Sequence, residues 1–169
     1  MKKLRLLQTV LDVFWFSSII AVIAIVLFLG YTLVNGPINI PINVNGEPHS
    51  MVSLTSKVIL FFIVVAYFIF VFGIYNLRKV LVLFSNKMIF EEDTIALLNK
   101  VGKSFLFSSL IIFVPLFFYN VIERGETKIE FGGGFSSFLF ASSLGLFFMV
   151  LSEVFKVAKT LKDENDLTV

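Results

Sequence analysis

The chain contains no cysteine and a single histidine, and only 15% of its 169 residues are charged. Without cysteine there are no disulfides, no thiolate metal sites and no cysteine nucleophile. His49, beside Glu47 in a segment rich in Pro and Asn, provides too few ligands for a structural metal site. The net charge of +2 is too small and too scattered for a nucleic-acid-binding surface. We therefore expect no metal, no cofactor and no direct nucleic-acid partner.

What the chain does have is four apolar stretches without a single charge. They cover residues 13–34, 58–77, 104–122 and 131–152. Each matches the roughly 20 helical residues that cross a hydrocarbon core of about 30 Å. Because lipid offers no hydrogen bonds, the backbone of each stretch must pair within itself, as a helix does. The sequence predicts an all-α integral membrane protein with four transmembrane helices in one membrane domain, residues 1–169.

The basic residues orient this domain through the positive-inside rule. With both termini inside, the inner loop 78–103, the tail 153–169 and the N-terminus together hold eleven Lys and Arg residues. The outer loops, 35–57 and 123–130, then hold only Lys57, Arg124 and Lys128. The bias predicts an N-in, C-in topology.

The loops also carry structural signals. In the first outer loop, Ile38, Ile40, Ile42 and Val44 alternate with polar residues or proline, which is typical of a short strand. A similar alternation at 127–132 suggests that the two outer loops pair as a small extracytoplasmic β-cap, the alternative being unpaired loops.

At the inner side, the second helix should continue past Arg78 and Lys79, and the last helix should project inward with Lys156, Lys159 and Lys162 on one polar stripe. A further helix, capped by Asp93 or Thr94, leads into the third span. It either extends that span into the cytosol or lies in the membrane interface.

Residues that could carry chemistry are few. Asp12, at the inner edge of the first span, is a candidate for an ion-linked role because a membrane carboxylate is costly. Its alternative is a surface residue close to the basic N-terminus. The serines of the spans have no histidine or lysine near them in the spans, so no serine hydrolase is expected. Small residues such as Ala141 and Gly145 suit close helix packing instead. We expect no enzyme.

Two inner segments carry a resemblance to a known family. Residues 87–102 place Phe90 before an acidic helix start, Glu91-Glu92-Asp93, and an apolar helix that ends near Gly102. The chain ends with an acidic–Asn–acidic–Leu–Thr–aliphatic pattern at 164–169, which contains Asn165, Asp166 and Leu167. With four spans, this resembles the uncharacterised bacterial membrane family DUF2975 over essentially the whole chain, although Ile89 stands where the family often has proline.

The resemblance implies a multi-pass protein of the bacterial inner membrane. It also implies a regulatory or signalling role, since members are often encoded beside a small helix-turn-helix regulator. Acidic groups on the inner face could then compete with DNA for the regulator's basic surface. The residues expected to bind such a partner are Phe90, Glu91, Glu92, Asp93, Asn165, Asp166 and Leu167. The alternative for the charged ones is a helix cap and a solvated helix end. The alternative function is a small transporter or channel subunit, formed by four-helix units that assemble as a homo-oligomer.

Overall fold

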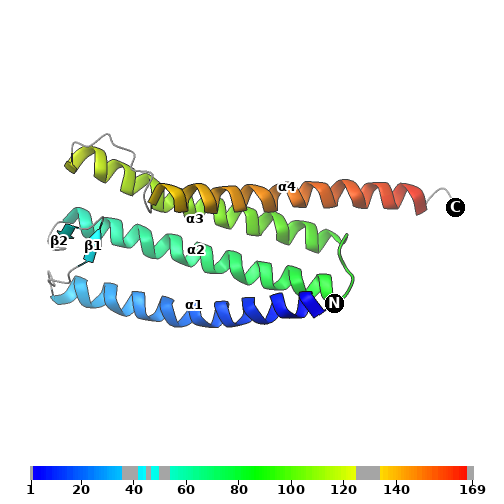
Figure 1. The fold of residues 1–169 in the computed structure, drawn as a ribbon, viewed down its shortest axis with the longest axis horizontal. Helices are drawn as coiled ribbons and strands as arrows, with labels where there is room; N and C mark the ends of the chain where they lie inside the picture. The colour runs from blue at the N-terminus through cyan, green and yellow to red at the C-terminus, as the bar shows by residue number, and fades with distance from the viewer. Residues whose placement is uncertain (1, 36–41, 45–46, 50–53, 125–133, 167–169) are drawn as a thin grey trace.

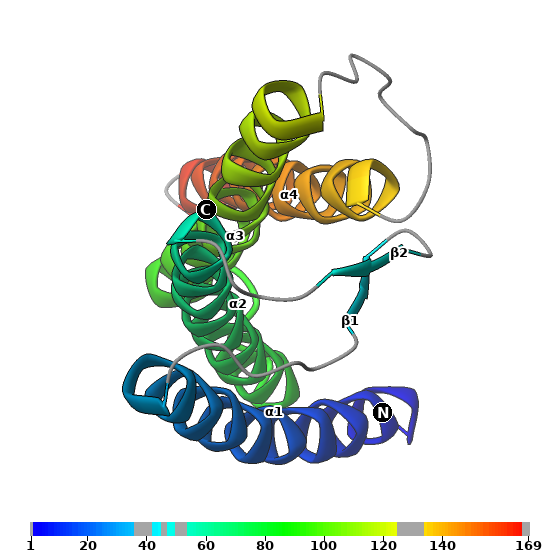
Figure 2. The ribbon, with the colours of Figure 1, turned by 90° about the vertical axis from the view of Figure 1, so that its left-hand side faces the viewer.

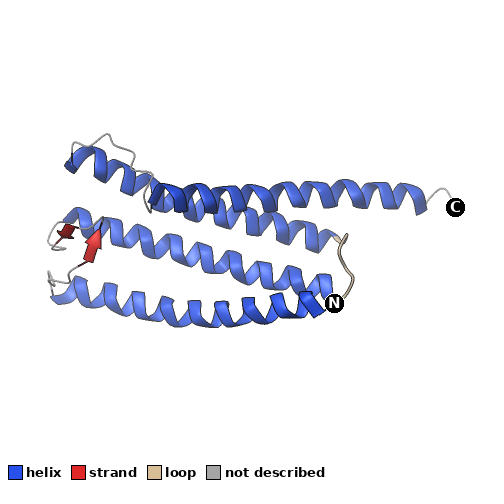
Figure 3. Cartoon of the chain, viewed as in Figure 1, coloured by secondary structure: helices blue, strands red, loops and turns tan. Residues whose placement is uncertain are grey.

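Four long helices make up almost all of the computed structural model, which describes residues 2–35, 42–44, 47–49, 54–124 and 134–166. Figures 1 and 3 show them running back and forth along one axis. Their bounds are α1 Lys2–Asn35, α2 Leu54–Ser85, α3 Glu92–Arg124 and α4 Gly134–Asp166. All four are long and apolar enough to cross a membrane. The predicted fold class is therefore confirmed, and the chain is a multi-pass membrane protein.

Each helix is longer than a bilayer requires. At 32 to 34 residues, each extends for about 50 Å, against a hydrocarbon core of about 30 Å. The extra turns confirm the predicted continuation of the second and last spans. The inner loop is reduced to residues 86–91, and the helix before the third span is continuous with it. Of the two alternatives for that helix, the extension of the third span is therefore observed and the separate interfacial helix is wrong. The helix begins at Glu92, so neither Asp93 nor Thr94 caps it.

The helices pack in chain order, α1 on α2, α2 on α3 and α3 on α4. In Figures 1 and 2, α1 and α4 lie on opposite edges, with α2 and α3 between them. The accessible surface is 11412 Å² for 19.1 kDa, against about 8,400 Å² for a compact soluble protein of that mass. Apolar side chains on the outer helices account for much of this excess: Phe16 on α1 is 67% exposed. In a bilayer these side chains face lipid.

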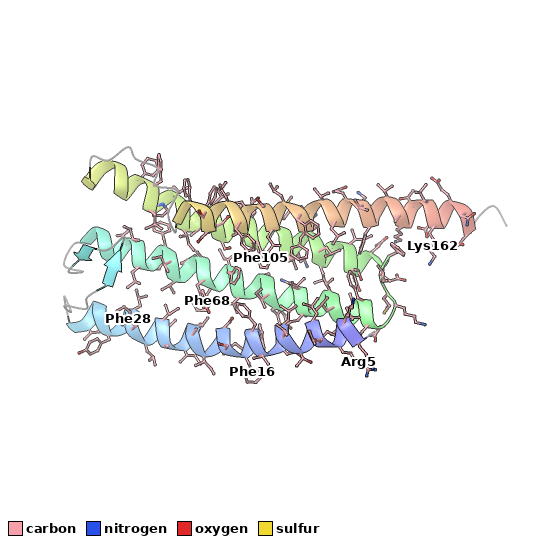
Figure 4. The ribbon with its side chains drawn as sticks, viewed as in Figure 1. Arg5, Phe16, Phe28, Phe68, Phe105 and Lys162 are labelled. Carbon is pink, nitrogen blue, oxygen red and sulfur yellow. The ribbon has the colours of Figure 1, made fainter. Side chains whose placement is uncertain are left out.

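The core lies where α2 and α3 cross, and its buried members are Ile74, Val101 and Phe105. The Phe105 ring stacks on Phe70 with centroids 5.2 Å apart, and Figure 4 shows Phe105 in the middle of the assembly. Gly73 permits this contact, because a Cβ there would lie 2.8 Å from the Phe105 ring. The centre of the bundle is thus an aromatic contact seated against a glycine.

Two helices approach each other closely where Gly102 of α3 meets Gly145 of α4. A Cβ on Gly145 would lie 2.8 Å from the carbonyl oxygen of Gly102, and a Cβ on Gly102 would lie 2.6 Å from the carbonyl oxygen of Gly145. The two backbones therefore touch, as small residues allow in membrane helices. Further along the same interface, the hydroxyls of Ser109 and Ser142 are hydrogen-bonded at 2.9 Å.

A short hairpin lies at the end of the bundle opposite the termini (Figures 2 and 3). Strand β1, Ile42–Val44, pairs antiparallel with β2, Glu47–His49. β1 falls inside the segment for which the alternation predicts a strand, but its partner here is the next strand of the same loop. The predicted pairing with residues 127–132 lies outside the described residues and stays a prediction.

The turn between α2 and α3 closes with a Schellman motif. The Met88 N–H donates to the Leu83 carbonyl at 3.0 Å, and the Lys87 N–H donates to the Phe84 carbonyl at 3.2 Å. Lys87 occupies the left-handed position of this motif, with φ of 63°. Glycine is the usual residue there because a Cβ is strained at positive φ.

The Gly102–Gly145 contact predicts the effect of a single methyl group. Gly145→Ala should lower the free energy of unfolding by roughly 1–3 kcal/mol, because the added carbon meets backbone that cannot move aside. The control is Gly30→Ala, since a Cβ at Gly30 meets nothing within 4 Å. The control should leave stability unchanged or raise it by up to about 1 kcal/mol through helix propensity. Unfolding of both variants by SDS in mild detergent provides the comparison, and equal losses would contradict the contact.

The strained Lys87 predicts a gain in stability. Lys87→Gly should raise the free energy of unfolding by about 1 kcal/mol, because glycine adopts positive φ without steric cost. Asn86→Gly, one residue earlier, should lower it, since no positive φ offsets the added freedom of the unfolded chain. The same SDS titration distinguishes the two, and a loss of stability in Lys87→Gly would show that its side chain has another role.

Candidate functional site

Both chain ends and the turn at 86–91 lie at one end of the bundle, which we call the turn end (Figure 1). Figure 4 shows Arg5 and Lys162 at this end, whereas Phe16, Phe68 and Phe105 lie along the middle and Phe28 lies toward the opposite end. Most of the predicted site residues belong to the turn, to the start of α3 or to the end of α4, so they also lie at this end. The turn end is the part of the described chain where charged side chains and exposed apolar side chains occur together.

Three phenylalanines connect the turn to α4. The Phe155 ring lies 5.8 Å from that of Phe84 and 5.7 Å from that of Phe90, between ring centroids. Phe84 ends the apolar stretch of α2, Phe90 belongs to the turn, and Phe155 belongs to the projecting part of α4. Phe90 remains 40% exposed. Aromatic packing of this kind fixes the turn on α4 while leaving one ring edge accessible.

Polar contacts also hold together this region, where the turn 86–91 and the start of α3 meet α4 and which we call the junction. The Thr94 hydroxyl donates to the Met88 carbonyl at 2.6 Å, which holds the turn against the first turn of α3. The Ser152 hydroxyl donates to the Ile95 carbonyl at 2.8 Å, across to α3. Both hydroxyls belong to buried residues, so these hydrogen bonds satisfy groups that are shielded from water.

An ion pair completes the junction. Lys159 Nζ donates to Glu92 Oε1 at 2.8 Å, and both residues lie beyond the predicted spans, 104–122 and 131–152. The hydrogen bond and the charge of Lys159 lower the pKa of Glu92, and the hydrogen bond to Glu92 raises the pKa of Lys159. Since the Glu92 side chain is 86% exposed, the pair contributes little to stability. It does set which way Glu92 points.

The structure brings together only part of the predicted site. Phe90, Glu91, Glu92 and Asp93 lie at the junction with α4, and Glu91 and Asp93 are exposed. Asn165 and Asp166 lie at the same end of the bundle but away from this junction, since α4 continues about 10 Å beyond Lys159 before it reaches Asp166. Leu167 is outside the described residues. Phe155 and Lys159, which complete the junction, were missed; their only signal is the apolar and lysine periodicity of the tail.

Asp12 has a fixed partner on α2. Arg78 Nε donates to Asp12 Oδ1 at 2.5 Å, and the Arg78 guanidinium also lies over the Trp15 ring, 4.4 Å from its centroid. Nearby, the Gln8 side chain donates to the Leu81 carbonyl at 2.9 Å. Asp12 is exposed, as expected for a surface residue near the N-terminus, but its charged partner is Arg78 of α2 rather than a basic residue of the N-terminus. An ion-linked role for Asp12 stays a prediction.

Several serines of the spans hydrogen-bond to backbone carbonyls or to one another. Ser18, Ser104, Ser108 and Ser109 each donate to a carbonyl three or four residues earlier. Among the described residues, no three His, Cys, Asp or Glu side chains cluster as metal ligands. What the described residues of the turn end offer is a surface that a partner could bind.

The contacts of Arg78 with Asp12 and Trp15 predict losses of stability that differ between variants. Asp12→Asn should lower the free energy of unfolding by at most about 1 kcal/mol, as for an exposed pair. Arg78→Ala should cost roughly 1–2 kcal/mol, because the contact with Trp15 and the packing of the stem are lost as well. Lys3→Ala, at an exposed residue, is the control. SDS unfolding in detergent measures the three; an equal effect of Asp12→Asn and Arg78→Ala would show that the ring contact contributes nothing.

Comparison with known proteins assigns the chain to a family. No curated protein and no solved structure is significantly similar to the chain. The family described as "Protein of unknown function (DUF2975)" matches residues 13–169, which include all of α2, α3 and α4 and most of α1. The resemblance of the inner loop and the C-terminal ending is thereby confirmed, and the chain belongs to the DUF2975 family.

Proposed function

We propose that the protein is a non-enzymatic regulatory protein of the bacterial inner membrane that binds a cytosolic protein partner at its turn end. The proposed partner is a small helix-turn-helix regulator. The observation that carries the proposal is the end of α4, which extends past the predicted span 131–152 with apolar side chains exposed. The proposed topology is N-in, C-in.

Charge supports this orientation. Basic residues occupy the turn-end parts of all four helices, from Lys2, Lys3 and Arg5 on α1 to Lys162 on α4. Lys and Arg concentrate on the cytoplasmic side of short membrane loops. A turn end that faces the cytosol places the junction and the end of α4 where a soluble partner can reach them.

The exposed apolar side chains of α4 beyond the predicted span, residues 153–166, support a protein partner. Val154, Val157 and Leu161 are 54%, 60% and 61% exposed, and their spacing of three and four residues places them on one helix face. Side chains of this kind within the span are covered by lipid, but these lie beyond it. An amphipathic helix with an unpartnered apolar face is a common recognition element for another protein.

The acidic residues support a basic partner. Glu91 and Asp93 are exposed at the start of α3, and Lys159 holds Glu92 in place beside them. A helix-turn-helix protein presents a basic surface to the phosphates of DNA. The carboxylates at 91–93 could bind that surface, which would withdraw the regulator from DNA. This step rests on the family resemblance as well as on the described charges.

The test is capture of the partner in native membranes. A photocrosslinking amino acid at Lys156 of the full chain should trap a small helix-turn-helix protein. The triple variant Val154→Ser/Val157→Ser/Leu161→Ser should reduce the crosslinked product at least tenfold, because each apolar side chain removed from an interface weakens binding by about 1 kcal/mol or more.

The matched control changes polar residues of the same segment. Glu153→Ser/Thr160→Ser/Lys162→Ser alters the same number of positions on α4 and should retain most of the product. Absence of any crosslinked regulator from the unsubstituted chain, together with unchanged transcription in a deletion strain, would refute the proposal.

A further inference from the structure

An open groove runs along the membrane face between α2 and α3, and the proposed partner surface does not use it. Its volume is about 430 Å³, within the range of small-molecule sites. Two of its seven lining residues belong to α2, Ile69 and Phe72. The other five belong to α3: Lys100, Lys103, Ser104, Phe107 and Ile111.

The length of the groove along the helix axis matches the thickness of one leaflet of the bilayer. The α3 residues follow one another at steps of one to four, on one face of the helix. From Lys100 to Ile111 the helix rises about 16 Å, and half of a hydrocarbon core is about 15 Å. Lys100 and Lys103 lie just before the predicted span 104–122. The basic end of the groove is therefore at the level of the lipid headgroups, and the rest is at the level of the acyl chains.

The surface of the groove is almost entirely apolar, so Lys100 and Lys103 line it with the aliphatic stems of their side chains. No lining residue is acidic, and neither lysine forms an ion pair within the part of the chain that the structure describes. The Ser104 hydroxyl already donates to the Lys100 carbonyl at 2.8 Å. Two ammonium groups with six N–H donors are thus left to face the membrane surface.

The remaining walls are apolar and face lipid. Phe72 and Phe107, one from each helix, are both 54% exposed, and Ile69 and Ile111 lie beside them in the groove. Such walls suit a hydrocarbon chain. A small soluble anion would leave them uncovered.

We propose that this groove binds one anionic phospholipid. Lys100 and Lys103 contact the headgroup phosphate, and an acyl chain lies against Phe72, Phe107 and Ile111. Lysine suits a phosphate as a compact charge, and two lysines favour a headgroup of net negative charge over a zwitterionic one.

The experiment places a fluorescent reporter in the groove of the full chain. Trp15, the one tryptophan, is replaced in Trp15→Phe, and Phe107→Trp provides the reporter. Vesicles of phosphatidylcholine receive either brominated phosphatidylglycerol or brominated phosphatidylcholine as the quencher. We expect the reporter to favour phosphatidylglycerol about fivefold, and Lys100→Gln/Lys103→Gln to reduce the preference to near one. A reporter without preference for the anionic lipid overturns the proposal.

Two further variants separate a site from general attraction. Lys156→Gln/Lys162→Gln removes the same charge from the end of α4 and should keep the preference. Lys100→Arg/Lys103→Arg retains the charge in the groove and should keep it too, which excludes a fold defect as the cause of the loss. An equal loss in the α4 variant means that the surface attracts anionic lipid without a site, and overturns the proposal.

A soluble competitor separates lipid from free phosphate. Excess glycerol phosphate should leave the preference for phosphatidylglycerol unchanged, because the acyl contacts are made only by the lipid. Displacement by glycerol phosphate would assign the lysines to a soluble anion and overturn the lipid assignment.

Discussion

Lipid cannot hydrogen-bond a peptide group, and this constraint governs the whole molecule. Every segment that crosses the membrane must be a helix that satisfies its own backbone hydrogen bonds. The sequence of these segments can therefore vary mainly in which apolar side chains it uses. The helices exceed the bilayer by about a dozen residues each. That excess is where charged residues, aromatic junctions and exposed faces occur together, and for this reason the turn end holds the candidate partner site.

The crossing segments can be predicted from sequence, but the helix ends cannot. Arg78 and Lys79 end an apolar run, yet α2 continues to Ser85, because a charge outside the hydrocarbon does not oppose helix formation. The helix stops where the backbone turns left-handed at Lys87. A lysine gives no signal for that conformation, whereas a glycine would have. The acidic residues at 91–93 did mark the start of α3, since they suit the positive end of a helix dipole.

The site is predictable only in its parts. The sequence indicates that Phe90 and the acidic run are notable, and that the tail carries lysines on one face. It does not indicate that Lys159, 67 positions away, pairs with Glu92, or that Phe155 contacts both Phe84 and Phe90. Those contacts depend on the register of α4 along α3. In the observed register Gly102 lies against Gly145, and neither local sequence specifies that these two glycines pair.

The pairing of Asp12 with Arg78 also constrains how the protein is made. The two residues are 66 positions apart, so α1 emerges from the ribosome and enters the membrane long before its partner helix exists. During that interval the carboxylate of Asp12 and the amide of Gln8 must rely on water at the membrane surface. Once α2 has been synthesised, Arg78 and the Leu81 carbonyl replace that water. The α1–α2 hairpin can therefore assemble early in translation, before α3 and α4 have left the ribosome.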